Sequence, residues 1–202
     1  MRVAVRLFFC AIVTLCACGP RGPAAHPAPP SADGGWRTMR AEHSVEVTAR
    51  TPEGKEETRR LRGAIAVERP DRFRLRALGP GGITLFDVLA VAGKVTVVQA
   101  LRDPSGSGME RIIAAMAGDL GAAYGLKPAP VGRRTSVAAD MVTVEEPERV
   151  VRLRAFRDGG GGRAYPGRIE IDNRAASYRV RIDVGETALD EALDPELFAA
   201  PQ

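Results

Sequence analysis

The feature that most constrains the fold is an alternation of apolar and polar residues with a period of two, beginning near His43. The cleanest example is Tyr178–Val184, where every second residue is apolar and the intervening residues are Arg179, Arg181 and Asp183. Val45–Ala49, Leu61–Val67 and Phe73–Ala77 alternate in the same way. Successive side chains of a strand point to opposite faces, so this pattern predicts strands with one covered face and one solvated face.

Further strands are expected at Val137–Val144, Arg149–Phe156 and Arg168–Asp172. Two more, Ile83–Val91 and Lys94–Leu101, are partly apolar on both faces and are therefore expected at the centre of the sheet, covered from both sides. About nine strands leave almost no room for crossover helices, which predicts a mostly antiparallel sheet. Asp158–Gly162 is expected to form a hairpin loop, because neither a helix start nor a Lys-Ser/Thr pair follows to complete a phosphate loop.

One strong helix is predicted at Ser107–Leu120. Ser107 and Glu110 have the spacing of a capping box, and the helix carries an apolar stripe at helical spacing. Shorter helices are expected at Trp36–Glu42 and Leu189–Leu193. The predicted fold is therefore mainly β: one strongly curved antiparallel sheet, an unclosed half-barrel with a helical lid. The stripe consists of Met109, Ile112, Ile113, Met116, Ala117 and Leu120.

The N-terminal residues 1–17 have the features of a signal peptide. Arg2 and Arg6 precede an apolar run, Leu7–Leu15, that is far shorter than the ~20 residues of a membrane-spanning helix. The following Leu-Cys-Ala-Cys18 resembles the lipobox of bacterial lipoproteins, which implies cleavage before Cys18 and lipidation of that residue. Residues 18–35 then form a Pro/Ala/Gly linker, and residues 36–202 are expected to form a single domain.

Composition excludes several classes of function. Without Arg2 and Arg6, the expected mature chain has 27 basic and 25 acidic residues, too even a balance for a nucleic-acid-binding protein. All three cysteines lie at or before position 18, so the domain has no disulfide. Its two histidines, His26 and His43, cannot form a zinc cluster, and no Gly-x-Ser-x-Gly motif occurs. We expect neither an enzyme nor a metal or other cofactor.

Asp87 is a carboxylate in phase with the apolar residues of its predicted strand. It alternates with Leu85 and Leu89, which suggests an inward orientation. Either its pKa is raised for a functional purpose, or it accepts hydrogen bonds near the rim of the sheet.

Glu68–Val98, ERPDRFRLRALGPGGITLFDVLAVAGKVTVV, resembles the LolA/LolB-type carriers and receptors of bacterial lipoproteins. Those proteins show an Arg-Pro-x-x-hydrophobic-Arg strand, a Gly/Pro loop and two apolar strands, and the tail ALDPELFAAP at Ala192–Pro201 is also similar. The resemblance implies a half-barrel that holds acyl chains on its concave face. LolB-type receptors also carry an exposed apolar residue in the loop that Gly79–Gly82 forms here, where this chain has glycine.

The expected function is that of a monomeric lipoprotein, anchored to the periplasmic side of the outer membrane. Its expected partners are acyl chains or lipoproteins and a periplasmic carrier protein. The alternative is a structural or assembly lipoprotein that binds a protein partner without lipid, and for the helix methionines plain core packing is an equal alternative. The residues expected to bind ligand are Val45, Val47, Ile65, Val67, Phe73, Leu75, Leu85, Leu89, Met109, Ile112, Ile113 and Met116.

Overall fold

The computed structural model describes residues 35–50, 54–100, 109–124, 126, 132–138 and 140–199. Within them the chain forms one α-helix, α1 (Met109–Ala123), two 3-10 helices, η1 (Pro80–Gly82) and η2 (Pro195–Phe198), and ten strands. The strands are β1 (Thr38–Arg50), β2 (Glu56–Glu68), β3 (Arg72–Leu78), β4 (Thr84–Val91), β5 (Lys94–Ala100), β6 (Arg134–Ala138), β7 (Met141–Glu146), β8 (Arg149–Gly160), β9 (Arg163–Asn173) and β10 (Tyr178–Leu189).

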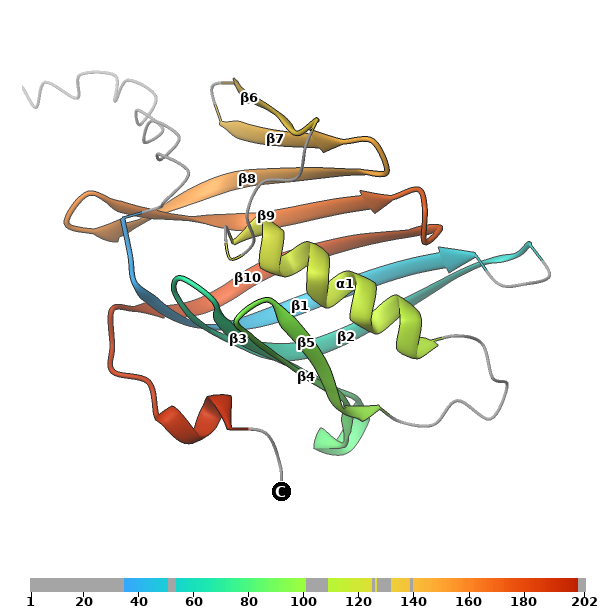
Figure 1. Cartoon of the computed structure of the whole chain (residues 1–202), viewed down its shortest axis with the longest axis horizontal. Coiled ribbons are helices and arrows are strands. Elements are labelled where there is room, and N and C mark those ends of the chain that lie inside the picture. Colours follow the sequence, from blue (N-terminus) through green and yellow to red (C-terminus); the bar gives the residue numbers. More distant parts are fainter. Residues whose placement is uncertain are drawn as a thin grey trace, which may run out of the picture.

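All ten strands belong to one antiparallel sheet with the order β5-β4-β3-β2-β1-β10-β9-β8-β7-β6. The first and last strands, β1 and β10, pair in the middle of the sheet. The edge strands β5 and β6 do not pair with each other, so the sheet stays open. α1 lies across one face, here called the inner face (Figure 1). The predicted unclosed antiparallel half-barrel is confirmed.

The inner face carries the main hydrophobic core. Apolar side chains of every strand from β1 to β4 and from β8 to β10 pack there with Ile113, Met116, Ala117 and Leu120 of α1. Val67, Val88 and Ile169 are completely buried. The period-two pattern of the sequence therefore identified the covered face correctly for β1, β2, β3 and β10.

The outer face is a ladder of alternating charges. Across five neighbouring strands the register places Arg60, Glu46, Arg181, Glu170 and Arg152 side by side. Arg60 and Glu46 form an ion pair at 2.8 Å. Opposite charges on directly opposed positions stabilise strand pairs, which accounts for the many arginines of the chain without a nucleic-acid surface.

Three predicted elements are wrong. Trp36–Glu42 is not helical, because β1 starts at Thr38 and pairs with β2 and β10. Met39 and His43 share a face, but with a strand's period rather than a helix's. Leu189–Leu193 is also not a helix: Leu189 ends β10 and the tail helix starts after Asp194, whose carboxylate accepts a 2.9 Å hydrogen bond from the amide of Glu196. Val137–Val144 is two strands, β6 and β7, which pair antiparallel with Ala138 opposite Met141.

The expected central position of the two apolar strands is wrong as well. β5 is an edge strand and β4 is its only neighbour in the sheet. The expected double cover is correct for β4, because α1 packs against its inner face and η2 against its outer face. A strand can thus be apolar on both faces without being central when segments outside the sheet supply the cover. The hairpin expected at Asp158–Gly162 is confirmed, but not as a long loop: β8 extends to Gly160, which pairs with Arg163, so only Gly161 and Gly162 separate β8 from β9.

Candidate functional site: the inner face and its helix

The inner face beneath α1 brings together most of the residues predicted to bind ligand. Strand residues Ile65, Phe73 and Leu75 are at most 2% exposed and belong to one cluster with Ile113 and Met116 of the helix. The same cluster contains Val45 and Val67. These seven side chains, from four elements separated by up to 70 residues in sequence, form one continuous apolar surface.

Three predicted residues lie at the border of this cluster. Val47, Leu85 and Ile112 are only partly buried and pack against it. For Met109 the structure describes the backbone at the start of α1, and its side chain and the predicted cap at Ser107 lie outside the described residues.

The placement of Leu89 on the inner face is wrong. β3 and β4 pair Phe73 with Ala90, Leu75 with Val88 and Ala77 with Phe86, which turns Leu89 to the outer face. There Leu89 packs with Ala66 and Phe198 in a second cluster beneath η2. The inner residues of β4 are Phe86, Val88 and Ala90. Periodicity alone missed them because β4 is apolar on both faces, and only the pairing with β3 identifies the inner one.

α1 approaches the sheet closely near its C-terminal end. A Cβ atom placed on Gly121 would lie 3.1 Å from Cε1 of Phe73, so a glycine permits this approach. Ala117 is fully buried on the same side of the helix. Helix and sheet are therefore in direct van der Waals contact, and α1 fills the inner face in this conformation.

A buried polar cluster that sequence analysis missed holds α1 to the far half of the sheet. Asp119 of α1 accepts a 2.7 Å hydrogen bond from Nδ2 of Asn173 and further bonds from Tyr178 Oη and Arg149. Burial raises the pKa of Tyr178, and the neighbouring Asp119 carboxylate raises it further. The sequence did contain one sign of this cluster: Asp119 lies next to the apolar stripe of the predicted helix, one turn from the C-terminal end of α1.

Glu146 extends the cluster outward. Its carboxylate pairs with Arg149 at 2.5 Å and with Arg133 at 2.9 Å. Burial disfavours the charged form of Glu146, but the hydrogen bonds from the two arginines outweigh burial and lower its pKa. Arg149 thus lies between Glu146 and Asp119 and links β7 and β8 to the helix.

A second polar contact, made by Tyr124, lies just beyond the C-terminal end of the helix. The ring of His43, on the inner side of β1, is 4% exposed, and its Nε2 lies 3.4 Å from Oη of Tyr124. Burial lowers the pKa of His43 to about 4, so the ring is neutral at pH 7. Tyr124 is also edge-on to Trp36, with ring centroids 6.3 Å apart.

The inward orientation expected for Asp87 is wrong, because Asp87 lies opposite Arg76 on the outer face. Of the two alternatives, its role as an acceptor of hydrogen bonds is confirmed and a raised pKa is wrong. Arg74 donates to it at 2.8 and 2.7 Å, and Arg76 at 3.3 and 3.1 Å. Burial opposes its ionisation, but these hydrogen bonds prevail and lower the pKa of Asp87. Because Arg74 also donates to the carbonyl of Leu197 at 3.0 Å, the group fastens the C-terminal segment to the outer face.

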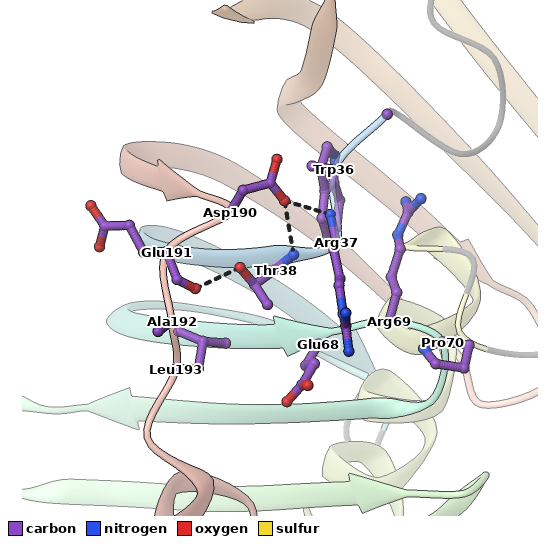
Figure 2. A pocket seen from close by; sticks show the side chains of 11 residues that line it. Trp36, Arg37, Thr38, Glu68, Arg69, Pro70, Asp190, Glu191, Ala192 and Leu193 are labelled. Carbon is purple, nitrogen blue, oxygen red and sulfur yellow. Dashed lines mark hydrogen bonds between the residues drawn. The ribbon is translucent and has the colours of Figure 1, made fainter. Parts of the chain in front are cut away.

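Two open hollows lie at the rim of the sheet, outside the helix contact. The larger, of about 980 Å³, lies between the β2–β3 turn and the extended tail residues 190–193 (Figure 2). Asp190 closes one wall, because its carboxylate accepts hydrogen bonds from the amides of Arg37 and Thr38 at 2.7 and 3.3 Å. The guanidinium group of Arg69 lies 4.0 Å from the centre of the Trp36 ring. The smaller hollow, of about 380 Å³, lies at the opposite ends of β1, β9 and β10.

The connection between β3 and β4 contains Gly79 and the 3-10 helix η1, which includes Gly81 and Gly82. Ile83 follows directly and is 60% exposed. Within the described residues, only Ile83 and Val137 are large hydrophobic side chains with high exposure. The structure thus places an exposed apolar side chain one position beyond the glycines.

Within the described ranges, no helix is long and apolar enough to cross a membrane. The same ranges contain no cluster of three or more His, Cys, Asp or Glu side chains able to hold a metal ion.

No protein-family model and no curated protein sequence matches the chain. Its structure is similar to that of a LolA superfamily protein from Nitrosomonas europaea, with 10% identity, a TM-score of 0.46 and coverage of 83% of this chain and 94% of that one. It is also similar to a putative outer membrane lipoprotein-sorting protein domain from Vibrio parahaemolyticus (10% identity, TM-score 0.38, coverage 83% and 91%). A third similar structure is a DUF1329 family protein from Desulfovibrio piger (11% identity, TM-score 0.35, coverage 83% and 91%). Similarities of this size assign neither ligand nor partner to this chain.

Proposed function

We propose that the protein is a lipid-anchored periplasmic carrier or receptor that binds acyl chains, free or as part of a lipoprotein, on its inner face. The observation that carries this proposal is the single helix that covers a large apolar face of an open sheet. No second layer of strands closes that face within the described residues. Displacement of one helix therefore uncovers a continuous apolar surface.

The border of the core supplies an entrance. Val47, Ala49 and Leu61 at one end of β1 and β2 are only partly buried, as are Val144, Leu153 and Tyr165 on the opposite half. An acyl chain that first contacts these side chains replaces water there before the helix moves. Each methylene that leaves water contributes about 0.8 kcal/mol, which offsets the lost contacts of α1 as the chain advances.

The anchor is proposed from the sequence context of Cys18 alone. Lipid on this cysteine, followed by the linker at residues 19–35, places the domain at a membrane surface, and we propose the periplasmic side of the outer membrane. Replacement Cys18→Ser is expected to release the protein into the soluble periplasmic fraction or to leave it unprocessed. A variant that still carries lipid at the mature mass contradicts this assignment.

We further propose that the domain has no catalytic activity and is monomeric. Its buried polar groups, Asp119, His43 and Asp87, are engaged with neighbouring side chains of the fold. The expected partners are a periplasmic carrier protein and the bound acyl chain or lipoprotein. We expect the half-barrel to hold the acyl chain without a cofactor.

A second candidate function is a structural or assembly lipoprotein that binds another protein and holds no lipid. The observation in its favour is the close packing of the inner face, where Val67 and Ala117 are fully buried. In that case α1 is a permanent part of the core.

The two candidates are separated by lipid extraction and probe binding. All described elements lie beyond residue 34, so the chain from Gly19 onward keeps them and lacks the cysteine that would contribute acyl chains of its own. Mass spectrometry of organic extracts is expected to find acyl lipid in this protein, and a fluorescent fatty acid is expected to bind it saturably. A protein without co-purified lipid that binds no fatty acid supports the assembly function instead.

A further inference from the structure

The smaller hollow, at the rim of the sheet, is lined mainly by polar and charged residues. It lies where β1 ends and β10 begins, next to the β9–β10 turn, and three arginines line it: Arg50, Arg174 and Arg179. The other lining residues are Thr48, Ala49, Glu56, Asp172, Asn173, Ser177 and Tyr178.

The charges in this hollow do not cancel. Its three arginines face two acids, Glu56 and Asp172. Glu56 forms an ion pair with Arg179 at 3.0 Å and is the direct cross-strand neighbour of Arg50, and Asp172 is the direct cross-strand neighbour of Arg179. Among the described residues, no acidic side chain pairs with Arg50 or Arg174. The lining of this hollow of about 380 Å³ therefore carries one positive charge in excess, and the guanidinium groups of Arg50 and Arg174 form no ion pair among the described residues.

The local backbone fixes this arrangement. The amide of Arg50 donates to the carbonyl of Ser177 at 3.3 Å, and the amide of Arg174 donates to the carbonyl of Glu148 at 2.8 Å. Asn173 Oδ1 accepts the amide of Ala176 at 2.9 Å and so closes the turn between the two strands. Both arginines thus start from backbone positions that the sheet and its turn hold in place.

The hollow also reaches the inner face. Thr48, Arg50 and Arg179 belong to the outer side of their strands, whereas Ala49 and Tyr178 pack with the main core. Tyr178 in addition donates to Asp119 of α1. An anion in the hollow would therefore lie beside Ala49, an inner-face residue that is only partly buried.

We propose that this hollow binds the phosphate group of an anionic acyl lipid whose hydrocarbon chain occupies the inner face. The inference rests on the proposed function and narrows its cargo to an amphiphile with a phosphate-bearing headgroup. Planar guanidinium groups form paired, charge-assisted hydrogen bonds with phosphate oxygens, and the Ser177 hydroxyl is an additional donor in the lining. The shared chemistry is the phosphate group, which a lipid headgroup or free phosphate can supply.

The test compares two lipids with the same chain, oleoyl-lysophosphatidic acid and monooleoylglycerol, on the chain from Gly19 onward. The phosphate-bearing lipid is expected to bind about tenfold more tightly or better. The double variant Arg50→Ala/Arg174→Ala is expected to abolish this preference and to leave monooleoylglycerol binding unchanged. Arg60→Ala/Arg62→Ala, which removes the same charge from the outer face of β2, is the matched control and is expected to keep the preference.

A parallel titration with inorganic phosphate distinguishes a lipid headgroup from free phosphate as the ligand. It also shows whether the phosphate site or the acyl-binding function is at fault if the expected result is not obtained. Equal binding of the two lipids, unaffected by the double variant, overturns the phosphate site while the acyl-binding function stands. If phosphate binds and depends on both arginines but the lipids do not differ, the hollow takes free phosphate and the lipid proposal is overturned. If neither lipid binds, the proposed function itself fails. All variants are exposed substitutions, and an unchanged thermal transition verifies that each one folds.

Discussion

Nδ2 of Asn173 on β9 donates a 2.7 Å hydrogen bond to the carboxylate of Asp119 on α1, and this bond ties the helix to the half of the sheet formed by the strands that follow it in sequence. Arg149 and Tyr178 donate to the same carboxylate. The covering helix is therefore attached by two different means: apolar packing against β3 and β4, and a buried polar cluster against β8, β9 and β10. This division makes the two attachments separately testable.

Asp119→Ala is expected to lower the free energy of unfolding by about 3 kcal/mol, because Arg149, Asn173 and Tyr178 lose a buried partner. Hydrogen exchange is expected to accelerate in α1 more than in β1 and β2. The matched control is Asp183→Ala, which breaks the half-exposed pairs with Arg168 and Arg181 and is expected to cost less than about 1 kcal/mol. Uniform acceleration of exchange throughout the sheet argues that α1 does not open separately.

Met116→Ala removes a buried side chain from the inner face of the helix contact. The resulting cavity is expected to destabilise the protein by roughly 3 kcal/mol. Because Met116 makes these contacts only when α1 is closed, the variant is also expected to bind a fluorescent fatty acid about fivefold more tightly.

Leu89→Ala is the control for Met116→Ala. It creates a comparable cavity in the outer cluster beneath η2 and is expected to destabilise the protein without changing fatty-acid affinity. Equal effects of the two variants on affinity contradict the proposal that α1 is the cover of the binding face.

His43 predicts a pH dependence of stability. Burial lowers its pKa from 6.5 to about 4, so the unfolded chain binds a proton that the folded protein excludes. Stability is therefore complete above pH 6.5 and falls as the pH drops towards 4, by about 2 kcal/mol between pH 6.5 and pH 5. His43→Gln, which keeps a polar group near Tyr124, is expected to flatten this dependence in denaturant titrations.

The carboxylates do not obscure the His43 effect. The pKa values of Glu146 and Asp87 are lowered from ordinary values of 4.5 and 3.8, so their stabilisation is lost only at lower pH. Titrations between pH 5 and pH 6.5 therefore isolate the histidine. An unchanged slope in the variant contradicts burial as the cause.

Ile83→Asp tests whether the exposed apolar residue after the glycine loop contacts the membrane during delivery of lipid. Transfer of bound fluorescent fatty acid to phospholipid vesicles is expected to slow several-fold, since a carboxylate does not enter the apolar part of a bilayer. Val137→Asp is the matched control, because Val137 has the same 60% exposure on the edge strand β6. Equal slowing by both variants points to loss of general surface hydrophobicity rather than a role for this loop.

The alternation of apolar residues by itself determined the mainly β architecture and the inner faces of β1, β2, β3 and β10, because successive side chains of a strand point to opposite faces. The short connections between strands predicted the antiparallel pairing, and an apolar stripe at helical spacing predicted α1. The context of Cys18 predicts an anchor that lies outside the described residues and stays a prediction.

Tertiary structure alone decided which face of β4 is inner, since both faces are apolar and only the register with β3 separates Val88 from Leu89. It also decided the position of β5 at the edge, because the cover of an apolar strand can come from α1 or η2 as well as from further strands. The Asp119 cluster and the hollow between Arg50 and Arg174 join residues more than 50 positions apart in sequence. Such groups become neighbours only when the pairing of β1 with β10 brings the two halves of the chain together, and no local periodicity encodes that pairing.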